Sequence, residues 1–396
     1  MSVNAMSFED ASTLLTSLTQ QVTGDASISV TDESDFVSVA TTLLQTGYDP
    51  IAVGISQIEG ETIFSDRRYT QHLRGLQRNS QQWGAITRKV NYLDNDVETS
   101  KVLDLADGTS VDPWKINKTH TIQTNFYGGN TYTRSYTITE DQLKTAFRGS
   151  AEFGSYWSGQ NTHIANMVDQ LQETESRACL NNLIAGKIDG DPTNVVHLLT
   201  VYKAQTGNTT ITSSNYLSDD EFVPFAKWLY GYMNTLIDMM SERSIKYHMN
   251  VTTYMGASVD ALKRFTPRNR MKCYMHNFFM NQINSSVLSS VFHNDLLRMV
   301  DYESINYWQS IDDPMAIKIT PAIMLADGSY DKGNDVEEDL IVGVLFDEEA
   351  CGITRILEGT APSPYNPRGR YYTVWMNWIT RWYNDFTENC IVLQLD

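Results

Sequence analysis

Three consecutive acidic residues, Asp347, Glu348 and Glu349, are candidates for acid–base catalysis. Two carboxyl groups held at a fixed separation can cleave a glycosidic bond, because one donates a proton while the other acts as a base or nucleophile. Side chains that are adjacent in the sequence point in different directions, so this run does not aim two carboxylates at one substrate. The pattern therefore favours a solvated acidic run over a catalytic pair.

Metal-ligating residue types are present, but their spacing does not fit a metal site. Asp327, Asp331 and Asp335 recur every four residues beside glycines, without the spacing of an EF-hand calcium loop. Asp and Gly are also common in turns, which favours a solvated acidic loop. The histidines are scattered, with no pair four residues apart: His72, His120, His163, His197, His248, His276 and His293. We therefore expect no metal site.

The four cysteines, Cys179, Cys273, Cys351 and Cys390, are far apart in the sequence and form no CxxC pair. They are expected to be free, buried thiols of a protein made in a reducing compartment. The sequence also lacks a P-loop, a GxGxxG turn, an HExxH motif and a GxSxG elbow. We predict no catalytic residue and no bound cofactor, and we do not expect an enzyme.

Basic residues gather in one segment of an acidic chain. The chain has 48 acidic and 30 basic residues and a formal net charge of −18, which disfavours a general nucleic-acid binder. Residues 61–91 reverse this balance with six basic side chains: Arg67, Arg68, Arg74, Arg78, Arg88 and Lys89. Such a segment can pair with acidic groups of its own chain or of a neighbouring copy, or it can be a solvated face. These six residues are our candidates for contacts between subunits.

Hydrophobic periodicity predicts two short helices within the first 60 residues, with helix stops at Gly24 and Gly47. Residues 86–138 are predicted to form short β-strands separated by turns. Gly128-Gly129-Asn130 is a candidate hairpin tip between two of these strands.

Two capping boxes predict helix starts further along the chain. Thr139 with Gln142 begins a short helix, and Ser218 with Glu221 begins a helix that continues to about Arg243. The second helix has the clearest apolar face in the chain.

An apolar stripe between the two boxes predicts a long helix over about 151–186, spanning about 50 Å. A helix of this length usually lies across a sheet. Residues 187–217 are expected to be a polar connection, and a further short helix is predicted over 281–298.

The last part of the chain is predicted to be β again. Strands over 316–325 and 340–346 flank a polar acidic loop at 327–339. In residues 366–384 apolar and aromatic side chains occur at both parities, which indicates a central strand or one covered on both sides. Residues 390–395 form a closing strand.

The chain contains 8 Trp, 21 Tyr and 14 Phe. Clustered aromatic residues can line a sugar site, but they are also enriched at the buried centres of protein interfaces, which is the interpretation we favour. No apolar run reaches about 18 residues, so no membrane span is expected. The first residues show no secretory signal.

The order of these elements and two stretches of sequence resemble a known family. The stretches are YTITEDQLKTAF at 136–147, followed closely by FGSYWS, and NPRGRYYTVWMNW at 366–378. They resemble segments of the major capsid proteins of small short-tailed phages, which have the Hong Kong 97-like (HK97-like) fold. The resemblance implies an α+β fold.

The resemblance also implies a division of the chain into five parts. These are an N-terminal arm at 1–60, an extended β E-loop at 61–135, a peripheral domain with a spine helix at 136–214, an axial domain at 215–339, and C-terminal strands at 340–396 that return to the peripheral domain.

The implied function is that of a structural major capsid protein, whose pentamers and hexamers form the icosahedral head around the phage genome. The implied partners are further copies of the chain, a portal protein, packaged double-stranded DNA in loose contact, and a scaffolding protein if assembly needs one. Assembly would take place in the host cytoplasm, without a membrane. The alternatives are an encapsulin-like nanocompartment shell protein, a tail or connector protein, and an acidic carbohydrate-active enzyme.

Overall fold

The computed structural model describes residues 8–23, 29–45, 73–78, 87–92, 106–107, 109–112, 114, 116, 121–126, 130–146, 150–249, 262–290, 302–324 and 330–396. The predicted helix stops at Gly24 and Gly47, residues 291–298, and Asp327 lie outside these ranges.

A five-stranded sheet runs in the order β4 (Val195–His197), β14 (Cys390–Gln394), β11 (Ile341–Asp347), β5 (Met271–His276) and β6 (Glu303–Ile305). Its three inner strands pair antiparallel, whereas β4 and β6 add parallel strands at the two edges. Along β11, Val342 and Leu345 face one core while Val344 and Phe346 face the other. A sheet with apolar side chains on both faces must be covered on both faces.

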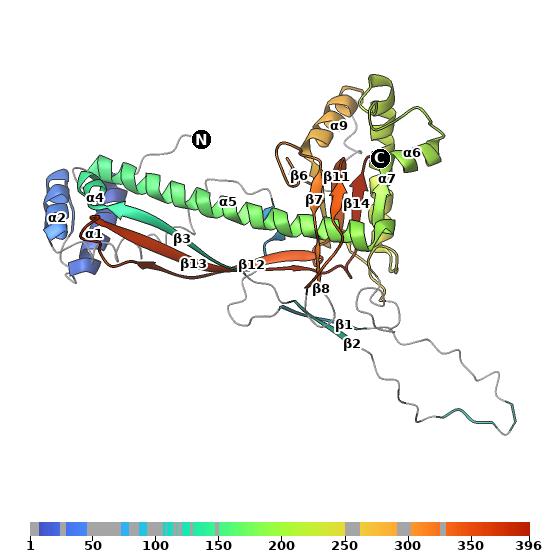
Figure 1. The fold of residues 1–396 in the computed structure, drawn as a ribbon, viewed down its shortest axis with the longest axis horizontal. Helices are drawn as coiled ribbons and strands as arrows, with labels where there is room; N and C mark the ends of the chain where they lie inside the picture. Colours follow the sequence, from blue (N-terminus) through green and yellow to red (C-terminus); the bar gives the residue numbers. More distant parts are fainter. Residues whose placement is uncertain are drawn as a thin grey trace.

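Helices provide that cover (Figure 1). One face packs against α6 (Leu198–Thr206), α7 (Asp219–Ser241) and α9 (Asn277–Ser290). The apolar stripe predicted for α7 is buried there, with Phe225 and Leu229 fully inaccessible. The other face packs against the C-terminal half of α5 (Ser150–Gly190), through Leu183 and Ile184.

The 41-residue helix α5 continues well beyond this sheet, because its rise of 1.5 Å per residue gives it a length of about 60 Å. Its N-terminal half lies on a second sheet of three strands, as Figure 1 shows. The strands are β12 (Cys351–Pro362), β13 (Tyr371–Asn384) and β3 (Asn130–Thr139), in that order. Here Ile164 packs against Met376 and Trp378.

The aromatic strand β13 is central in this sheet, as predicted, since it pairs with β12 on one side and β3 on the other. Only one of its faces is well covered. Tyr372, Val374 and Trp378 point toward the buried side, whereas Trp375 retains 43% of its accessible surface.

The two predicted N-terminal helices are α1 (Phe8–Thr23) and α2 (Glu33–Gln45), which pack on each other and on α5. Near them, α4 (Glu140–Ala146) follows β3. A separate antiparallel pair, β1 (Thr87–Tyr92) and β2 (Thr121–Phe126), lies toward the other end of the molecule (Figure 1).

Two short ladders complete the fold. β7 (Ile317–Ile319) pairs with β10 (Val336–Glu338), and β8 (Ala322–Met324) pairs with β9 (Tyr330–Lys332). Single 3₁₀ turns occur at Arg74–Leu76, Pro192–Asn194 and Arg268–Arg270.

Of the two predicted capping boxes, one is formed. The Thr139 hydroxyl accepts a bond from the Gln142 amide, and the Gln142 side chain accepts one from the Thr139 amide. The box at Ser218 is wrong, although the helix after it is confirmed. Ser218 makes no side-chain cap bond, and the Glu221 side chain accepts hydrogen bonds from Asn208 and Thr210 instead.

The predicted polar connection at 187–217 is also wrong in part. It contains the end of α5, the edge strand β4 and the helix α6. The first turn of α6 is capped by Asp396, whose carboxylate accepts bonds from the amides of Leu199 and Thr200 at 2.9 and 3.1 Å. A cap supplied from the far end of the chain leaves no local signal.

Several other boundaries differ from the prediction. The strand predicted over 316–325 is split into β7 and β8 at Thr320-Pro321, since proline has no amide hydrogen to donate to a ladder. The acidic loop at 327–339 contains β9 and β10, and α9 begins at Asn277 rather than at 281. Gly128 and Gly129 of the predicted hairpin tip lie outside the described residues, and the flanking strands β2 and β3 belong to different sheets.

All four cysteines are free and buried, as predicted. Burial raises the pKa of Cys273 and of Cys390 to about 12. Within the described ranges, no helix is long and apolar enough to cross a membrane.

We expect Trp378→Ala to lower the free energy of unfolding by about 3–5 kcal/mol, because its indole is buried and its removal leaves a cavity. The matched control is Trp375→Ala, three residues away on the open side of the same strand, for which we expect a much smaller loss. Urea denaturation of the unassembled subunit measures both. Equal losses would contradict the burial pattern of β13.

Candidate intersubunit interface

The structure places four of the six predicted basic contact residues. Arg67 and Arg68 lie outside the described residues. Arg74 and Arg88 are exposed, whereas Arg78 and Lys89 are partly buried. Arg74 and Arg88 stay predicted contacts to a neighbour, whereas Arg78 and Lys89 form ion pairs within the chain.

Lys89 of β1 inserts its ammonium between acidic groups near the C-terminus. Its Nζ lies 2.8 Å from Oδ2 of Asp385 and also contacts Glu388. It reaches Oε2 of Glu349 at 3.3 Å. The guanidinium of Arg264 lies 3.0 Å from the same Glu388 oxygen and is the second cation of this set.

A second set of ion pairs adjoins the first. Arg270 donates to Oε1 of Glu348 at 2.9 Å and also contacts Glu349. Arg78 lies 3.7 Å from the other oxygen of Glu348. We call the eight residues of both sets the anchor cluster: Arg78, Lys89, Arg264, Arg270, Glu348, Glu349, Asp385 and Glu388.

Charge compensation explains how these groups remain buried. Burial opposes the charge of Lys89, but Asp385 and Glu388 outweigh it and raise its pKa. Burial likewise favours the neutral form of Asp385, yet Lys89 and Arg264 hold its pKa below the ordinary value. For Glu388 burial prevails, and the pKa is raised. Removing Lys89 therefore leaves the buried carboxylates of Asp385 and Glu388 without their ammonium, which is costly.

The segment around Arg78 is fixed to the body as well. Leu73 and Leu76 are buried in the core beneath α5, and the amide of Arg78 donates to the carbonyl of Ile353 at 2.8 Å. Gly75 is in a tight position, because a Cβ there would lie 2.8 Å from the Tyr274 hydroxyl. The anchor cluster and this segment together hold the base of the β1–β2 pair.

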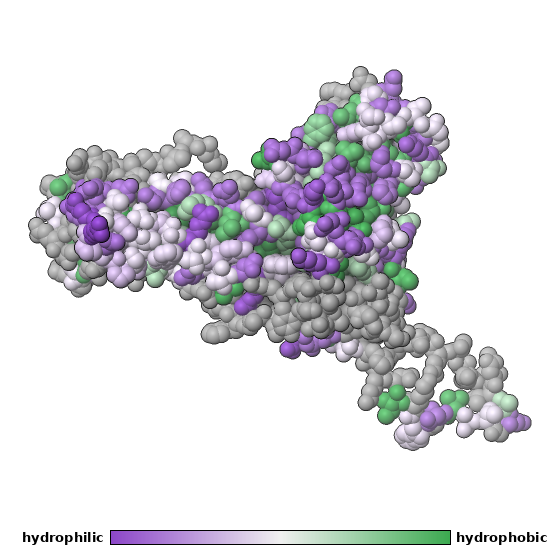
Figure 2. All heavy atoms as spheres, in the orientation of Figure 1, coloured by the Kyte–Doolittle hydropathy of each residue, from purple (hydrophilic) through white to green (hydrophobic). Residues whose placement is uncertain are grey.

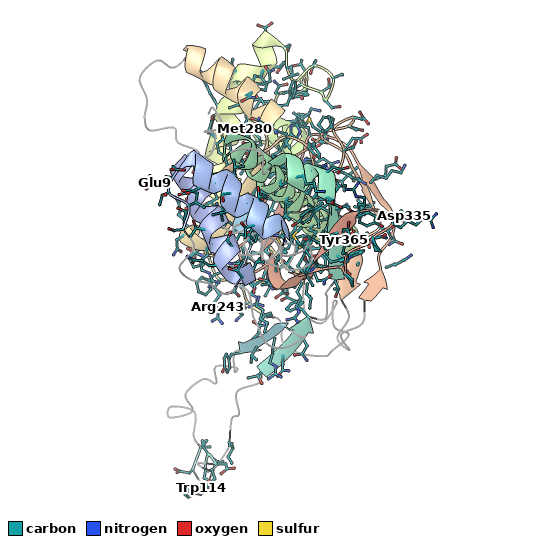
Figure 3. All side chains as sticks on the ribbon, turned by 90° about the vertical axis from the view of Figure 1, so that its left-hand side faces the viewer. Glu9, Trp114, Arg243, Met280, Asp335 and Tyr365 are labelled. Atoms are coloured by element: carbon teal, nitrogen blue, oxygen red, sulfur yellow. The ribbon has the colours of Figure 1, made fainter. Side chains whose placement is uncertain are left out.

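Beyond this base the chain reaches away from the body. Trp114 and Ile116 retain 84% and 79% of their accessible surface, and Val111 is also exposed. Figure 2 shows apolar residues uncovered at the end of this arm, and Figure 3 shows Trp114 at its far end. Large apolar side chains that are exposed at the end of an arm form a candidate contact surface.

The two stretches that carry the family resemblance lie side by side. β3 and β13 pair so that Thr139 faces Tyr371. At this junction the buried Glu140 carboxylate accepts two bonds from Arg370, at 2.9 and 3.0 Å, and one from the Tyr365 hydroxyl at 2.8 Å. The motifs therefore form a single contact that joins the start of α4 to the turn before β13.

The candidate catalytic carboxylates take part in the fold. Glu348 and Glu349 are bound by Arg270, and Asp347 accepts a bond from the Glu349 amide at 2.8 Å. A groove of about 880 Å³ beside α6 and α7 has no acidic residue among the described residues that line it. A glycosidase site needs two carboxylates. In the described part of the chain, no group of three His, Cys, Asp or Glu side chains is placed to hold a metal ion.

Comparison with known families decides the identity. The model of the Phi29-like phage major capsid proteins matches residues 12–394 of this chain. The chain belongs to that family. No curated protein matches this capsid protein significantly.

Solved structures show the same fold. A chain of the Staphylococcus phage Andhra capsid is 14% identical, with a TM-score of 0.55 and coverage of 84% of this chain and 86% of that one. A chain from the structure of the head fiber and inner core protein gp22 of native bacteriophage P68 is 15% identical, with a TM-score of 0.54 and coverage of 81% and 83%. The fold of this capsid protein is HK97-like and α+β.

The chain is thus a structural protein of the phage virion, located in the capsid. The family match confirms the predicted family and class of function. It does not favour the nanocompartment, tail or enzyme alternatives.

We expect Lys89→Met to destabilise this capsid protein by about 3–5 kcal/mol, because it leaves Asp385 and Glu388 buried without their ammonium. Arg88→Met is the matched control. It removes the same charge from the adjacent, exposed residue, and we expect it to lower the free energy of unfolding by about 0.5 kcal/mol or less. Urea denaturation at pH 7 measures the difference, and similar losses would exclude an anchoring role for Lys89.

The buried His248, which lies near the anchor cluster, predicts a loss of stability in acid. Burial, reinforced by Lys187 and Arg264, lowers the pKa of His248 to about 4, against a hydrogen bond to the Leu262 carbonyl. An unfolded histidine takes up its proton near pH 6.5, so this contribution is present above that pH and is lost as the pH falls toward 4.

The difference in the pKa of His248 between the folded and unfolded chain should therefore lower the free energy of unfolding by about 3 kcal/mol as the pH falls from 7 to 4. Denaturation midpoints across this range measure the slope, which His248→Gln should flatten. His163→Gln, at an exposed position on α5, should leave the slope as it is. An unchanged slope in His248→Gln would show that other groups cause the acid sensitivity.

Proposed function

We propose that this chain assembles into pentamers and hexamers that close into an icosahedral shell around the double-stranded genome of the phage. Membership of a major capsid protein family supports this proposal. Assembly would take place in the host cytoplasm, with a portal protein at one vertex and with a scaffolding protein if closure needs one. The chain would act as a building subunit and catalyse no reaction.

The division of the chain follows from the same proposal. Residues 1–60 would be the N-terminal arm and 61–135 the E-loop. Residues 136–214 and 340–396 would build the peripheral domain around α5, and 215–339 would form the axial domain. The packing of β3, β12 and β13 on the N-terminal half of α5 supports a peripheral unit, whereas the five-stranded sheet is shared, with β5 and β6 from 215–339 and β11 and β14 from 340–396.

The arm with its anchored base is the observation that carries the proposal. Buried ion pairs fix the base of this extension, and Trp114 and Ile116 are exposed at its end. This arrangement supports a contact with a neighbouring molecule. Extended arms reach surfaces that a compact domain cannot, and repeated contacts of this kind stabilise a shell. Arg74 and Arg88, together with Arg67 and Arg68, are proposed to meet acidic groups of the adjacent subunit.

Contact with DNA would be loose. The net charge of −18 repels phosphate at long range, so we expect weak binding that moderate salt abolishes. A shell of this kind encloses its genome without binding it tightly.

Electron microscopy and sedimentation of the purified protein, expressed together with the head genes of its phage, test the proposal. Closed shells of uniform size are the expected result. A stable monomer or a single open ring under all conditions would overturn it.

We expect Trp114→Ala to leave the melting temperature of the subunit unchanged, because the indole is 84% exposed, and to lower the yield of shells about tenfold. Asp107→Ala is a control at another exposed position of the arm that removes no apolar surface. Wild-type yields from Trp114→Ala would show that the end of the arm does not contribute to assembly.

A further inference from the structure

The loop between β6 and β7 presents an apolar side chain flanked by acids. Five consecutive residues, Gln309–Asp313, are exposed, and Ile311 retains 72% of its surface. Asp312 and Asp313 follow it, and within the described part of the chain neither carboxylate meets a cation. We call this segment the 309–313 loop.

The 309–313 loop is held firmly at its base. The amide of Trp308 donates to the carbonyl of Pro314 at 3.0 Å and so closes the loop. The Trp308 indole is fully buried and donates to the carbonyl of Ile341 at 2.7 Å. Gln309 exchanges two further bonds with the backbone of Lys318, at 2.6 and 2.9 Å. A loop fixed in this way loses little conformational entropy when it binds.

The groove beside α6 and α7 has the complementary chemistry. Trp228 and Tyr232 stack at 4.8 Å between ring centroids and, with the half-exposed Met239, supply apolar surface. Lys227 and Lys246 are exposed on its lining. Neither lysine forms an ion pair within the described residues, and none of the described lining residues is acidic. In a chain of net charge −18, such a surface is suited to an acidic partner.

The groove and the loop lie at opposite edges of the five-stranded sheet. The groove is lined by β4, which forms one edge, and the loop follows β6, which forms the other. Four strand spacings of about 4.8 Å separate the edges by about 19 Å, so the loop cannot reach the groove of its own chain. Figure 1 shows α6 and α7 near the edge beside β14, and β6 at the opposite edge.

We propose that the 309–313 loop of one subunit seats in the α6–α7 groove of the next copy, with Ile311 against Trp228 and Tyr232, and Asp312 and Asp313 beside Lys227 and Lys246. Two different surfaces on opposite edges make a head-to-tail contact, which forms a ring when the rotation between subunits closes. The inference rests on the proposed function, since it names the contact that would join subunits within a pentamer or hexamer.

Carbodiimide coupling of assembled particles tests the contact directly. The reagent activates a carboxylate and takes up its oxygen as a urea, which leaves an amide to an adjacent lysine. We expect peptides that link Lys227 or Lys246 to Asp312 or Asp313, together with a ladder of multimers in electrophoresis. Unassembled subunits should give neither.

An internal control is available in the same sample. Lys318 and Glu337 form an exposed ion pair of 2.7 Å within one chain, so they should couple in particles and in free subunits alike. Particles in which this pair couples, but no lysine of the groove couples to the loop, would overturn the inference and leave the proposed function standing.

Charge exchange provides a second test. Lys227→Glu with Lys246→Glu should lower the yield of shells about tenfold without a change in melting temperature. Adding Asp312→Lys and Asp313→Lys to the same chain should restore it. The control Lys318→Glu with Glu337→Lys keeps the net charge and should assemble normally. Wild-type yields from the first variant, or no recovery in the fourfold variant, would overturn the pairing.

Failure of the proposed function would look different. A wild-type chain that forms neither rings nor shells would remove both the function and the inference. Shells that form without the coupled peptides would remove the inference alone.

Discussion

One long helix has to bury two different sets of side chains, and the arrangement of the whole capsid protein depends on it. The C-terminal half of α5 covers the five-stranded sheet, and the N-terminal half covers the three-stranded sheet. Because a helix is stiff along its axis, it holds the two sheets in a fixed relation, and Cys351 and Ile353 at the start of β12 also join the core of the five-stranded sheet. The close packing at Gly186, where a Cβ would lie 2.3 Å from the ring of Phe386, shows how near the helix approaches the last turn before β14.

The anchor cluster fixes the base of the arm to the body, just as α5 fixes the two sheets to each other. Its cations and carboxylates come from segments that are far apart in the sequence and meet at the base of β1. A base fixed in each free subunit reduces the ordering that assembly must impose on the arm. Stable folding of the subunit and readiness for contact are therefore combined in one chain, with the buried charges near the body and the exposed apolar groups at the end of the arm.

Local signals predicted most of the helices and the family, whereas long-range pairing could not be predicted. The Thr139 capping box, the stripe of α7 and the aromatic strand β13 all depend on neighbouring residues, and each is found in the structure. By contrast, β12 went unpredicted, and α6 depends on a cap from Asp396.

The same limit applies to the interface. Composition identified a basic segment, but it could not distinguish Lys89, which lies in a buried ion pair, from its exposed neighbour Arg88. The distinction depends on Asp385, which is 296 positions away in the chain. The Ser218 box fails for a related reason, because Glu221 binds residues that precede the helix.

The thiols of this protein bear on how its particle endures outside the host. A virion leaves the reducing interior of a cell for surroundings that contain oxygen, where accessible thiolates are oxidised or form mixed disulfides. Here all four sulfurs are buried, and burial raises the pKa of Cys273 and of Cys390 to about 12, which disfavours their reactive thiolate forms. Burial limits the access of oxidants to these sulfurs, so we expect a shell built from such subunits to resist thiol oxidation after release.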